Sequence, residues 1–396
     1  MLGTADRLTQ IAGVELSVAT VSKMVKVPTV IQGEHITYYI LPYGKGNTHE
    51  NREYEPLWQQ IQQQAQPDVI HVHGTEFSHG LAYIKACGNE RVVVSIQGLK
   101  SAYYYYYYGL TRWDIYSHLA PLDLITGSII KQQQKFKRQS EYEKKILHNI
   151  CHIIGRTSWD KARTWAINPD AQYHFCNETL QQEFYDGSQW SYSNCSKHTI
   201  FLSQAGYPIK GLHQLLRSMP LILRHYPDTR VRVAGGDITK VRTLHDFILY
   251  TGYGRIVKSM IRRLNLQDHI TFTGPLNAEQ IKQEYLRTNV FVCPSTIENS
   301  PNSLGEAQLL GTPCIASYVG GIPDMMRGNE DNLYRFEETE MLAAKICRVF
   351  ADKDKQTDMR KEAAKRHSPD QNVRQLRNIY EIVEQGNKTF LTRTNE

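Results

Sequence analysis

The chain has 396 residues, of which 41% are hydrophobic and 22% are charged, and its formal net charge is +6. No apolar run is long enough to cross a bilayer, so the composition predicts a soluble globular protein with room for two or three domains. The 7 cysteines include no Cys-x-x-Cys pair. This pattern excludes a disulfide framework and a zinc site, and it favours reduced thiols in the cytoplasm.

Short apolar runs alternate with amphipathic stretches in the first half of the chain. The runs that predict strands are "VELSVAT", "ITYYIL", "DVIHVH", "RVVVSI" and "CHIIGRT", at residues 14–20, 36–41, 68–73, 91–96 and 151–157. Residues 53–66, "EYEPLWQQIQQQAQ", have the period of a helix.

A second series of apolar runs begins near residue 198. It comprises "HTIFLSQ", "TRVRVAGG", "HITFTG", "NVFVCP" and "TPCIAS", at residues 198–204, 229–236, 269–274, 289–294 and 312–317. Helical stretches at 210–226 and 278–287 separate some of these runs. Nearly continuous apolar strands between helices predict an α/β fold with parallel sheets, and two such series predict two doubly wound domains.

The polar stretch at 184–198, which contains Gly and Ser, predicts the domain boundary. We therefore predict a first domain at 1–190 and a second domain at 197–368. A C-terminal helix at 369–386 is expected to return to the first domain.

The stretch "TIENSPNSLGEAQLLGTP", residues 296–313, predicts a helix that can bind an anion. Ser300 has the residue type of an N-cap and Pro301 that of a first helical position, so we expect the helix to run from Ser300 to Gly311. The positive end of its dipole would face the carboxyl end of the preceding strand, where ligands of open α/β sheets bind. The amides that could hold an anion are those of Asn302, Ser303 and Leu304.

Two carboxylates, Glu298 and Glu306, flank the start of this helix. A carboxylate can accept two hydrogen bonds from a pair of neighbouring hydroxyls. The spacing suits an extended ligand that carries phosphates between two diols, such as a nucleotide sugar. It suits two solvated glutamates equally well.

Other candidate binding residues follow strands of the second series. Lys210 opens a helix and is a natural phosphate partner, although a solvated lysine is the plainer explanation. Gly320 and Gly321 lie in the turn "YVGGIPDM", and Gly274 ends the run "HITFTG". These glycines would let the backbone approach a ligand closely, or they only form tight turns.

Together these motifs resemble the signature of the family-4 retaining glycosyltransferases. The resemblance rests on "ENSPNSLGE", "GTPCIAS" and "GGIPD", with weaker support from "DVIHVHG", "VVVSIQG" and "KGLHQLL", and it covers most of the chain. It implies the GT-B fold, in which two Rossmann-like domains face each other across a cleft. It also implies transfer of a sugar from a nucleotide sugar to a glycan or glycolipid acceptor in surface polysaccharide synthesis, with no cofactor and no divalent metal.

The resemblance implies roles for single residues. Glu298 would face the transferred sugar and orient it, and Glu306 would hold the ribose of the nucleotide. Lys210 and the helix amides would stabilise the departing diphosphate during a front-face substitution that retains the configuration.

Three positions depart from the family pattern. Gln204 stands where an arginine usually precedes the phosphate lysine, and Gln97 stands where a histidine often ends a strand. Pro301 replaces a glycine and removes one amide donor. Donor binding would therefore depend more heavily on Lys210 and the helix dipole.

Six consecutive tyrosines, residues 103–108, follow the strand that ends near Gln97. They predict either a half-buried loop or short helix, or an aromatic lip in which Tyr105 and Tyr106 contact the acceptor.

Two further residues end strands of the first domain. His73 is expected to touch the acceptor, whereas His71 on the same strand is expected in the core. Arg156 could meet an acidic acceptor or the donor phosphate, or it could pair with a local carboxylate.

Basic side chains also cluster on a predicted helix. Lys131, Lys135 and Arg138 share one helix face. This face suits the anionic inner surface of a membrane, to which the protein would bind peripherally, or it is a solvated basic face. A second basic stretch at 254–266 is interpreted as ordinary surface.

Other functions remain open at this point. A nucleotide-sugar epimerase would use the same architecture, and a non-catalytic nucleotide-sugar-binding protein would explain the three departures. A dinucleotide oxidoreductase is disfavoured, because no G-x-G-x-x-G follows the first strand. No nucleic-acid partner is expected.

The start of the sequence differs from the implied fold. Only one short helix precedes the first strand at 15–20. The implied fold should begin with another strand and a Gly-rich turn, so we expect that roughly 20–30 residues, the size of one β–α unit, are missing.

Overall fold

The computed structural model describes residues 2–11, 13–43, 54–110, 112–116, 129–240, 252–352 and 359–393. The chain divides into two compact α/β units. The first unit comprises residues 1–101, 138–179 and 367–396, and the second comprises residues 102–137 and 180–366. The predicted limits placed residues 102–137 in the first domain, whereas their contacts group them with the second unit.

The first unit contains a parallel sheet in the order β4-β5-β6-β7. Its strands are β4 (Ile70–His73), β5 (Val92–Ser95), β6 (His152–Gly155) and β7 (Gln172–Phe175). A separate three-stranded sheet has the order β1-β3-β2, with β1 and β3 parallel and β2 antiparallel to β3. Its strands are β1 (Leu16–Ser22), β2 (Thr29–Gln32) and β3 (Ile36–Pro42).

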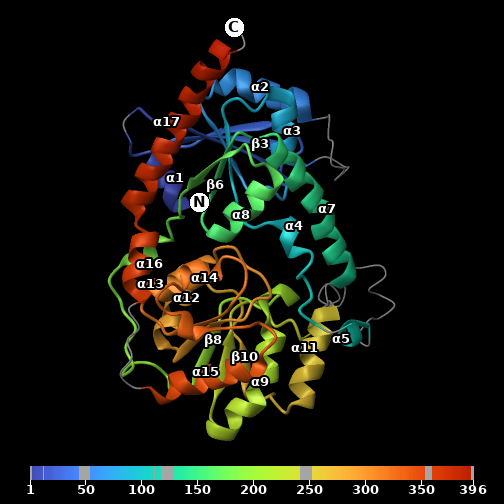
Figure 1. Cartoon of the computed structure of the whole chain (residues 1–396), viewed down its shortest axis with the longest axis vertical. Coiled ribbons are helices and arrows are strands. Elements are labelled where there is room, and N and C mark those ends of the chain that lie inside the picture. The colour runs from blue at the N-terminus through green and yellow to red at the C-terminus, as the bar shows by residue number, and fades with distance from the viewer. Residues whose placement is uncertain are drawn as a thin grey trace. The chain divides into compact units, whose positions relative to one another are not determined.

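Helices accompany the sheets of the first unit (Figure 1). They are α1 (Leu2–Leu8), α2 (Glu55–Ala65), α3 (Ser78–Cys87), α8 (Ser158–Ile167) and α17 (Pro369–Arg393). Two further helices, α4 (Lys100–Tyr103) and α7 (Ile129–His148), contribute residues to both units. Helix α17 packs against α1 and β5, so the C-terminal helix belongs to the first unit.

The second unit contains a six-stranded parallel sheet in the order β10-β9-β8-β11-β12-β13. Its strands are β8 (Thr199–Leu202), β9 (Arg230–Val233), β10 (Ile270–Phe272), β11 (Val290–Cys293), β12 (Cys314–Ser317) and β13 (Leu333–Tyr334). Every residue of β8, β11 and β12 is buried. These central strands are continuously apolar because helices cover both faces of such a sheet.

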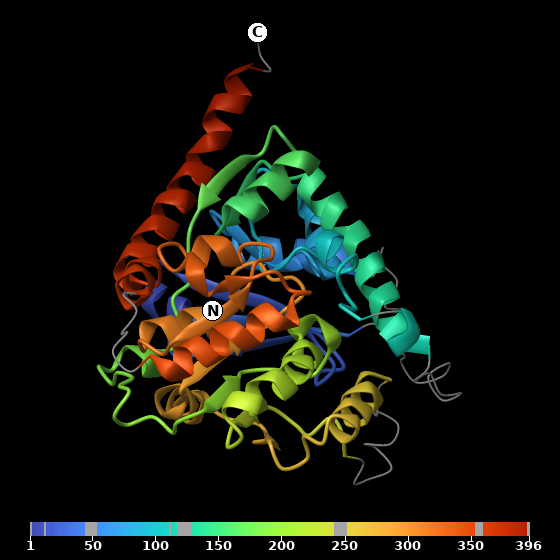
Figure 2. The ribbon, with the colours of Figure 1, turned by 60° about the horizontal axis from the view of Figure 1, so that its bottom comes forward.

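The helices of the second unit alternate with its strands along the chain. They are α5 (Arg112–Tyr116), α9 (Leu212–His225), α11 (Gly252–Arg263), α12 (Ala278–Arg287), α13 (Asn302–Leu309), α14 (Ile322–Met325), α15 (Thr339–Ala351) and α16 (Met359–Arg366). Among the described residues, three 3-10 turns accompany them: η2 (Gln182–Tyr185), η3 (Pro208–Lys210) and η4 (Glu330–Asn332). Helices α9 and α15 pack side by side (Figure 1, Figure 2). Within the described residues, no helix combines the length and the apolar character needed to cross a bilayer.

The predicted helix start, with Ser300 as N-cap and Pro301 as the first helical residue, is one residue too early. Helix α13 begins at Asn302, and Pro301 is its N-cap in an extended conformation without a side-chain cap. The Ser300 hydroxyl instead lies 3.6 Å from the sulfur of Met325, to which it donates. Ser300 therefore serves packing, and the helix begins one residue after the proline.

Gly211 allows two segments of the second unit to approach closely. Gly211 joins η3 to α9 with φ 72°, and a Cβ atom there would lie 1.6 Å from the carbonyl oxygen of Pro294. Only glycine fits this position, because both the dihedral angle and the free space exclude a side chain.

We expect Gly211→Ala to lower the free energy of unfolding by at least about 2 kcal/mol, because it combines a steric clash with backbone strain. Gly187 offers a matched control, since its φ is 92° and a Cβ atom there would have no neighbour within 4 Å. Gly187→Ala should cost only about 1 kcal/mol. Urea denaturation of both variants measures the difference, and equal losses would contradict the close approach at Gly211.

Candidate functional site

The strand order of the second unit indicates where a ligand would bind. The order reverses between β8 and β11, which are neighbours in the sheet. Ligands of doubly wound folds bind beyond the carboxyl ends of the strands at such a switch point. Lys210 follows β8, and the loop that carries Glu298 follows β11, so both candidate residues lie at this point.

Lys210 and Glu298 form a buried ion pair. The Nζ atom of Lys210 lies 2.6 Å from Oε1 of Glu298, and the two side chains are 18% and 9% exposed. The hydroxyl of Ser295 donates to the same oxygen over 3.1 Å. Burial disfavours the charged form of Lys210, but Glu298 and Tyr207 together with a smaller effect of Cys293 outweigh it, so the pKa of Lys210 is raised. Lys210 is therefore a permanent cation next to a buried carboxylate.

The turn at Gly320 and Gly321 packs against the backbone of Glu298. Gly320 has φ 54°, and a Cβ atom there would lie 1.9 Å from the Glu298 carbonyl oxygen. The amide of Gly321 donates to that same oxygen over 3.0 Å. The close approach that the structure shows is therefore to the backbone of Glu298, and an approach to a ligand stays a prediction. Gly274 instead pairs with Gly235 through two backbone hydrogen bonds of 3.0 and 3.1 Å.

Glu306 lies on α13 and contacts a tyrosine of α12. The hydroxyl of Tyr285 is 3.2 Å from Oε2 of Glu306 and 3.0 Å from the carbonyl oxygen of Ser303. Burial raises the pKa of Glu306 to about 7, although the hydrogen bond from Tyr285 opposes this shift. Sequence reasoning missed Tyr285, whose only signal was a helical period that predicts burial.

The first amides of α13 differ in whether the helix itself already uses them as hydrogen-bond donors. The amide of Leu304 donates to the carbonyl oxygen of Pro301 over 3.0 Å, so the turn itself occupies it. Asn302 and Ser303 precede it at the first two positions of the helix. Gln204 follows β8 with an exposed side chain.

The run of tyrosines contacts the loop that carries Glu298. We call residues 102–110 the tyrosine segment. The Tyr103 hydroxyl accepts a hydrogen bond from the amide of Asn299 over 3.0 Å, and the hydroxyl of Thr296 donates to the carbonyl oxygen of Tyr106 over 2.7 Å. Both ends of the loop are thereby held by backbone and side-chain groups of this segment.

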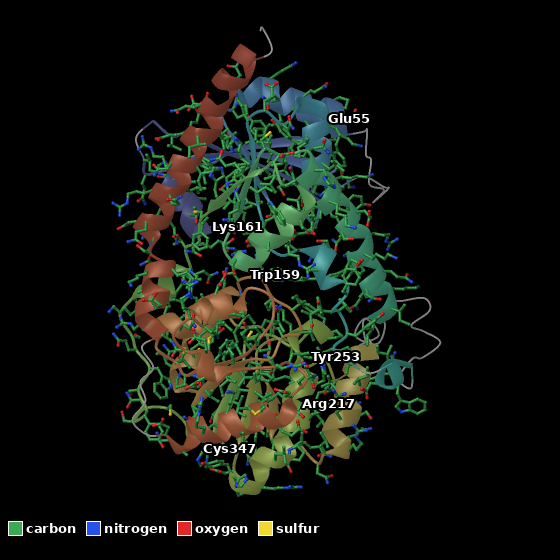
Figure 3. All side chains as sticks on the ribbon, viewed as in Figure 1. Glu55, Trp159, Lys161, Arg217, Tyr253 and Cys347 are labelled. Carbon is green, nitrogen blue, oxygen red and sulfur yellow. The ribbon has the colours of Figure 1, made fainter. Side chains whose placement is uncertain are left out.

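Helix α9 also holds the tyrosine segment and the helix that follows it. The Nε2 atom of His213 donates to the carbonyl oxygen of Gly109 over 2.8 Å, and its Nδ1 atom lies 3.1 Å from the hydroxyl of Tyr253 on α11. Arg217 forms an ion pair of 2.8 Å with Asp114 on α5. Figure 3 labels Arg217 and Tyr253 on their helices. Residues 102–116 are thus an integral part of the second unit.

The side chains of the tyrosine segment divide into buried and exposed ones. Tyr103 and Tyr107 are buried, whereas Tyr105 and Tyr106 are 67% and 48% exposed. The rings of Tyr104 and Tyr105 lie 3.9 Å apart. The two tyrosines predicted to contact an acceptor are therefore available at the surface, and that role stays a prediction.

Gln97 and Arg156 meet in the first unit at the carboxyl ends of their strands. Arg156 pairs with Glu178 over 3.0 Å, and the amide of Gln97 donates to the other carboxylate oxygen over 2.8 Å. Arg156 also donates to the carbonyl oxygens of Ile96 and Gln97. The structure thus shows the pairing with a local carboxylate, and a role toward an acceptor stays a prediction.

His73 ends β4 with an exposed side chain and stacks on His71 at 3.9 Å. The Nδ1 and Nε2 atoms of His71 lie 2.7 Å from the Tyr380 hydroxyl and 2.5 Å from the Ser95 hydroxyl. His71 is therefore engaged in packing, while His73 remains the candidate for an acceptor contact.

Comparison with protein families supports a transferase domain in the second unit. Residues 193–366 match the family described as Glycosyl transferases group 1. The chain is similar to D-inositol 3-phosphate glycosyltransferase of Streptomyces coelicolor, with 27% identity over 41% of this chain and 34% of that protein. The chain spans less than half the length of the first curated relatives that it matches.

Comparison with solved structures shows the fold. The sucrose-phosphate synthase of Thermosynechococcus elongatus superposes with a TM-score of 0.67 and 18% identity, over 99% of this chain and 92% of that one. The Anabaena protein Alr3699/HepE, solved in complex with UDP, has a TM-score of 0.60 and 14% identity, over 87% and 86%. The predicted GT-B fold is thus confirmed.

The raised pKa of Glu306 gives a testable pH dependence. A carboxyl group whose pKa rises from 4.5 to about 7 on folding binds its proton more tightly in the native state, so the free energy of unfolding should fall as the pH rises through this window. Glu306→Gln keeps the shape and removes the titration. We expect the parent to lose roughly 3 kcal/mol relative to Glu306→Gln between about pH 4 and about pH 8.

Urea denaturation across this pH range measures the difference between the two proteins. Parallel pH profiles of the parent and Glu306→Gln would show that Glu306 does not titrate there.

Proposed function

We propose that the chain is a metal-independent family-4 glycosyltransferase that retains the configuration of the sugar it transfers. Its donor would be a nucleotide sugar, and its acceptor a glycan or lipid-linked glycan of surface polysaccharide synthesis. The observation that carries the proposal is the buried Lys210–Glu298 pair at the switch point of the second unit. This region lies inside the residues that match the group 1 family.

The donor would bind along the carboxyl ends of β8 and β11. Glu306 would accept hydrogen bonds from the two ribose hydroxyls, and Glu298 would accept one from the sugar. Lys210 and the first amides of α13 would face the diphosphate, because both present positive charge to it. Gln204 adds an uncharged donor where the family has an arginine.

In the transfer step the bond between the anomeric carbon and the phosphate oxygen breaks, and its electron pair leaves with the diphosphate. The acceptor hydroxyl attacks the same face of the sugar, and its proton passes to a departing phosphate oxygen. The charge that grows on the diphosphate is stabilised by Lys210, which is already fixed by its partner. Glu298 orients the sugar and is not required as a base.

The descriptions of similar proteins support a nucleotide-sugar donor and a lipid-linked acceptor for this proposal. One solved relative is described in complex with UDP, and one similar sequence is named phosphatidylinositol N-acetylglucosaminyltransferase gpi3 subunit, from Schizosaccharomyces pombe. On the acceptor side we propose His73, Gln97, Arg156, Tyr105 and Tyr106. We further propose a cytoplasmic protein that binds peripherally to the inner membrane surface, where a lipid-linked acceptor is presented.

A non-catalytic nucleotide-sugar-binding protein is the second candidate. It is favoured by Gln204 and Pro301, which each remove a phosphate-binding group that the family pattern provides. Binding of a nucleotide sugar without turnover on a panel of acceptors would support it. Consumption of the donor without acceptor, with a changed sugar configuration, would instead indicate an epimerase.

The two glutamates should separate binding from turnover. Glu306→Ala is expected to weaken the affinity for the bare nucleoside diphosphate about tenfold, because it removes charged hydrogen bonds to the ribose. Glu298→Ala should leave that affinity unchanged and lower kcat about a hundredfold or more. Calorimetry with UDP and GDP and a transfer assay measure both effects.

Lys210→Ala and Gln204→Arg complete this set of variants. Lys210→Ala should lose diphosphate affinity but not nucleoside affinity, and Gln204→Arg should gain diphosphate affinity at low salt. Since Lys210→Ala leaves Glu298 buried and unpaired, the folding of this variant is checked by its thermal midpoint.

If Glu306→Ala and Glu298→Ala both bind the nucleoside diphosphate like the parent, the assignment of Glu306 to the ribose is wrong.

Tyr105 and Tyr106 should affect the use of the acceptor and leave donor binding unchanged. Their side chains are exposed, so replacing both by serine is expected to leave the fold and the donor affinity intact while lowering kcat/KM for the acceptor about tenfold, since a stacked aromatic ring contributes roughly 1 kcal/mol. The buried Tyr107 provides a contrast, because Tyr107→Ser should lower stability. A parallel fall in donor affinity in the double variant would show that the two tyrosines are structural.

A further inference from the structure

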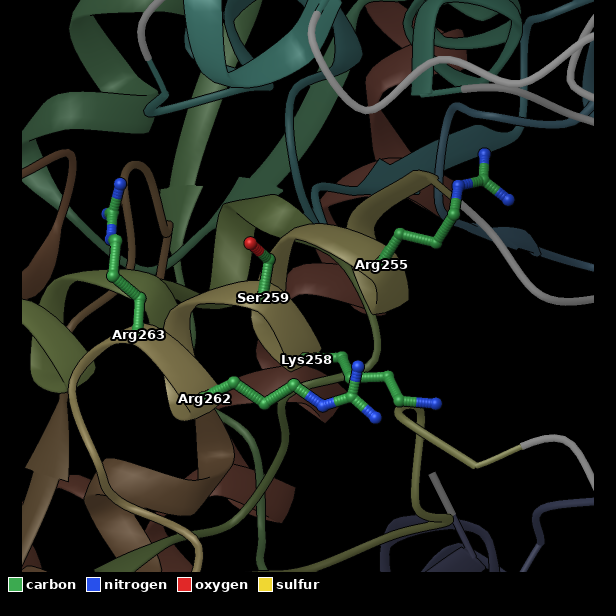
Figure 4. Close-up of a pocket in the computed structure, with 5 residues that line it drawn as sticks. All are labelled: Arg255, Lys258, Ser259, Arg262 and Arg263. Atoms are coloured by element: carbon green, nitrogen blue, oxygen red, sulfur yellow. The ribbon is translucent and has the colours of Figure 1, made fainter.

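Helix α11 carries a dense positive face. Its four cationic residues are Arg255, Lys258, Arg262 and Arg263, which line an open hollow together with Ser259 (Figure 4). The helix contains no acidic residue, and its opposite face is buried through Tyr253, Ile256, Val257 and Met260. The cations are therefore the outward side of an amphipathic helix and not scattered surface charges.

These cations repel one another. Arg255 and Lys258 are three residues apart, and Lys258 and Arg262 are four apart, which are spacings at which like charges destabilise a helix. Among the described residues, no carboxylate lies within ion-pair distance of Arg262 or Arg263. An anionic surface would relieve this repulsion.

An exposed tryptophan stands beside the positive helix. Helix α5 packs against α11, and its Trp113 is 78% exposed. The acidic residue of α5, Asp114, forms an ion pair with Arg217, so it offers little charge to oppose the cations of α11. A large exposed indole on a helix that packs against a basic one is typical of the boundary between lipid headgroups and acyl chains.

A second basic element begins at the same place. A Cβ atom on Gly252, the first residue of α11, would lie 3.5 Å from Cδ1 of Ile129, the first residue of α7. The next residues of α7 include Lys131 and Lys135, and residues 129–137 contain no Asp or Glu. The start of α7 therefore adds basic residues close to the start of α11.

We propose that this surface docks the second unit onto an anionic lipid bilayer. We call it the α11 face, and it comprises the four cations of α11, Trp113, Lys131 and Lys135. The cations would lie at the lipid phosphates, and the indole would enter the headgroup region. A nucleic acid would also attract the cations, but the exposed tryptophan beside them favours a bilayer. The sequence analysis interpreted only the α11 part of this surface as ordinary, because the neighbouring α5 could not be inferred, and it already considered Lys131 and Lys135 for a membrane surface.

The inference deepens the proposed function and rests on it for its purpose, since a docked transferase meets a lipid-linked acceptor at the bilayer. Docking itself needs neither donor nor acceptor. Vesicle binding is therefore measured on the full chain without nucleotide. A protein that binds vesicles but transfers no sugar would then contradict only the proposed function.

The test is sedimentation with vesicles of phosphatidylcholine alone and of phosphatidylcholine with phosphatidylglycerol. We expect binding to the anionic vesicles only, and a loss of binding at high salt. Replacing Arg262 and Arg263 together by glutamate should weaken binding at least about tenfold, given that each cation near an anionic surface contributes severalfold. Arg360→Glu with Lys361→Glu on α16 changes the net charge equally at exposed positions and should bind like the parent.

A second measurement does not depend on charge reversal. Brominated lipids should quench tryptophan fluorescence of the parent, and most of that quenching should disappear in Trp113→Phe, which keeps an aromatic ring. Three results would overturn the proposal: equal binding to neutral vesicles, equal weakening in the α16 control, or binding to a DNA duplex with none to anionic vesicles at the same salt.

Discussion

The candidate site depends on two places where backbones touch without room for a side chain. Gly211 and Gly320 both have positive φ, and each approaches a carbonyl oxygen of the loop after β11, at Pro294 and at Glu298. This loop is buried on every residue from Ser295 to Ser300. Because Lys210 immediately precedes Gly211, the first approach delivers its ammonium group to the carboxylate of Glu298. The second approach fixes the backbone that carries this carboxylate.

The ion pair that results is buried, and it supports our proposal that the site binds a diphosphate without a metal. A buried lysine needs an anionic partner, and removing that partner would leave a charge that costs about 3–5 kcal/mol. With Glu298 in place, Lys210 is fixed as a cation before any ligand binds, so little reorganisation is needed when charge develops. Glu306 differs, because its neighbour Tyr285 is neutral and burial raises its pKa. Glu298 is therefore ion-paired, whereas burial raises the pKa of Glu306 to about 7.

Sequence patterns predicted the parts of this arrangement that depend on local chemistry. The apolar runs located the strands of the six-stranded sheet except β13, which has only two residues, and strand–helix alternation indicated their parallel order. The residue types at Lys210, Glu298 and the Gly320–Gly321 turn marked the strand ends. The start of α13 was misplaced because Ser300 has the residue type of a cap but packs against Met325. Contacts between distant segments, such as Tyr285 with Glu306, leave no local pattern.

The tyrosine segment is the clearest case of such a distant contact, because it forms hydrogen bonds with residues far away in the sequence. It follows a strand of the first unit along the chain, yet its hydrogen bonds go to Thr296, Asn299 and His213 of the second unit. The Tyr103 hydroxyl accepts from the amide directly after Glu298, and the Tyr106 carbonyl accepts from a residue two before it. The exposed rings of Tyr105 and Tyr106 lie between these two anchors. A sugar that stacked on the rings would therefore contact a segment that is hydrogen-bonded to residues on both sides of Glu298. An acceptor and Glu298, the carboxylate that we propose to orient the sugar, would then be held by one continuous element of structure.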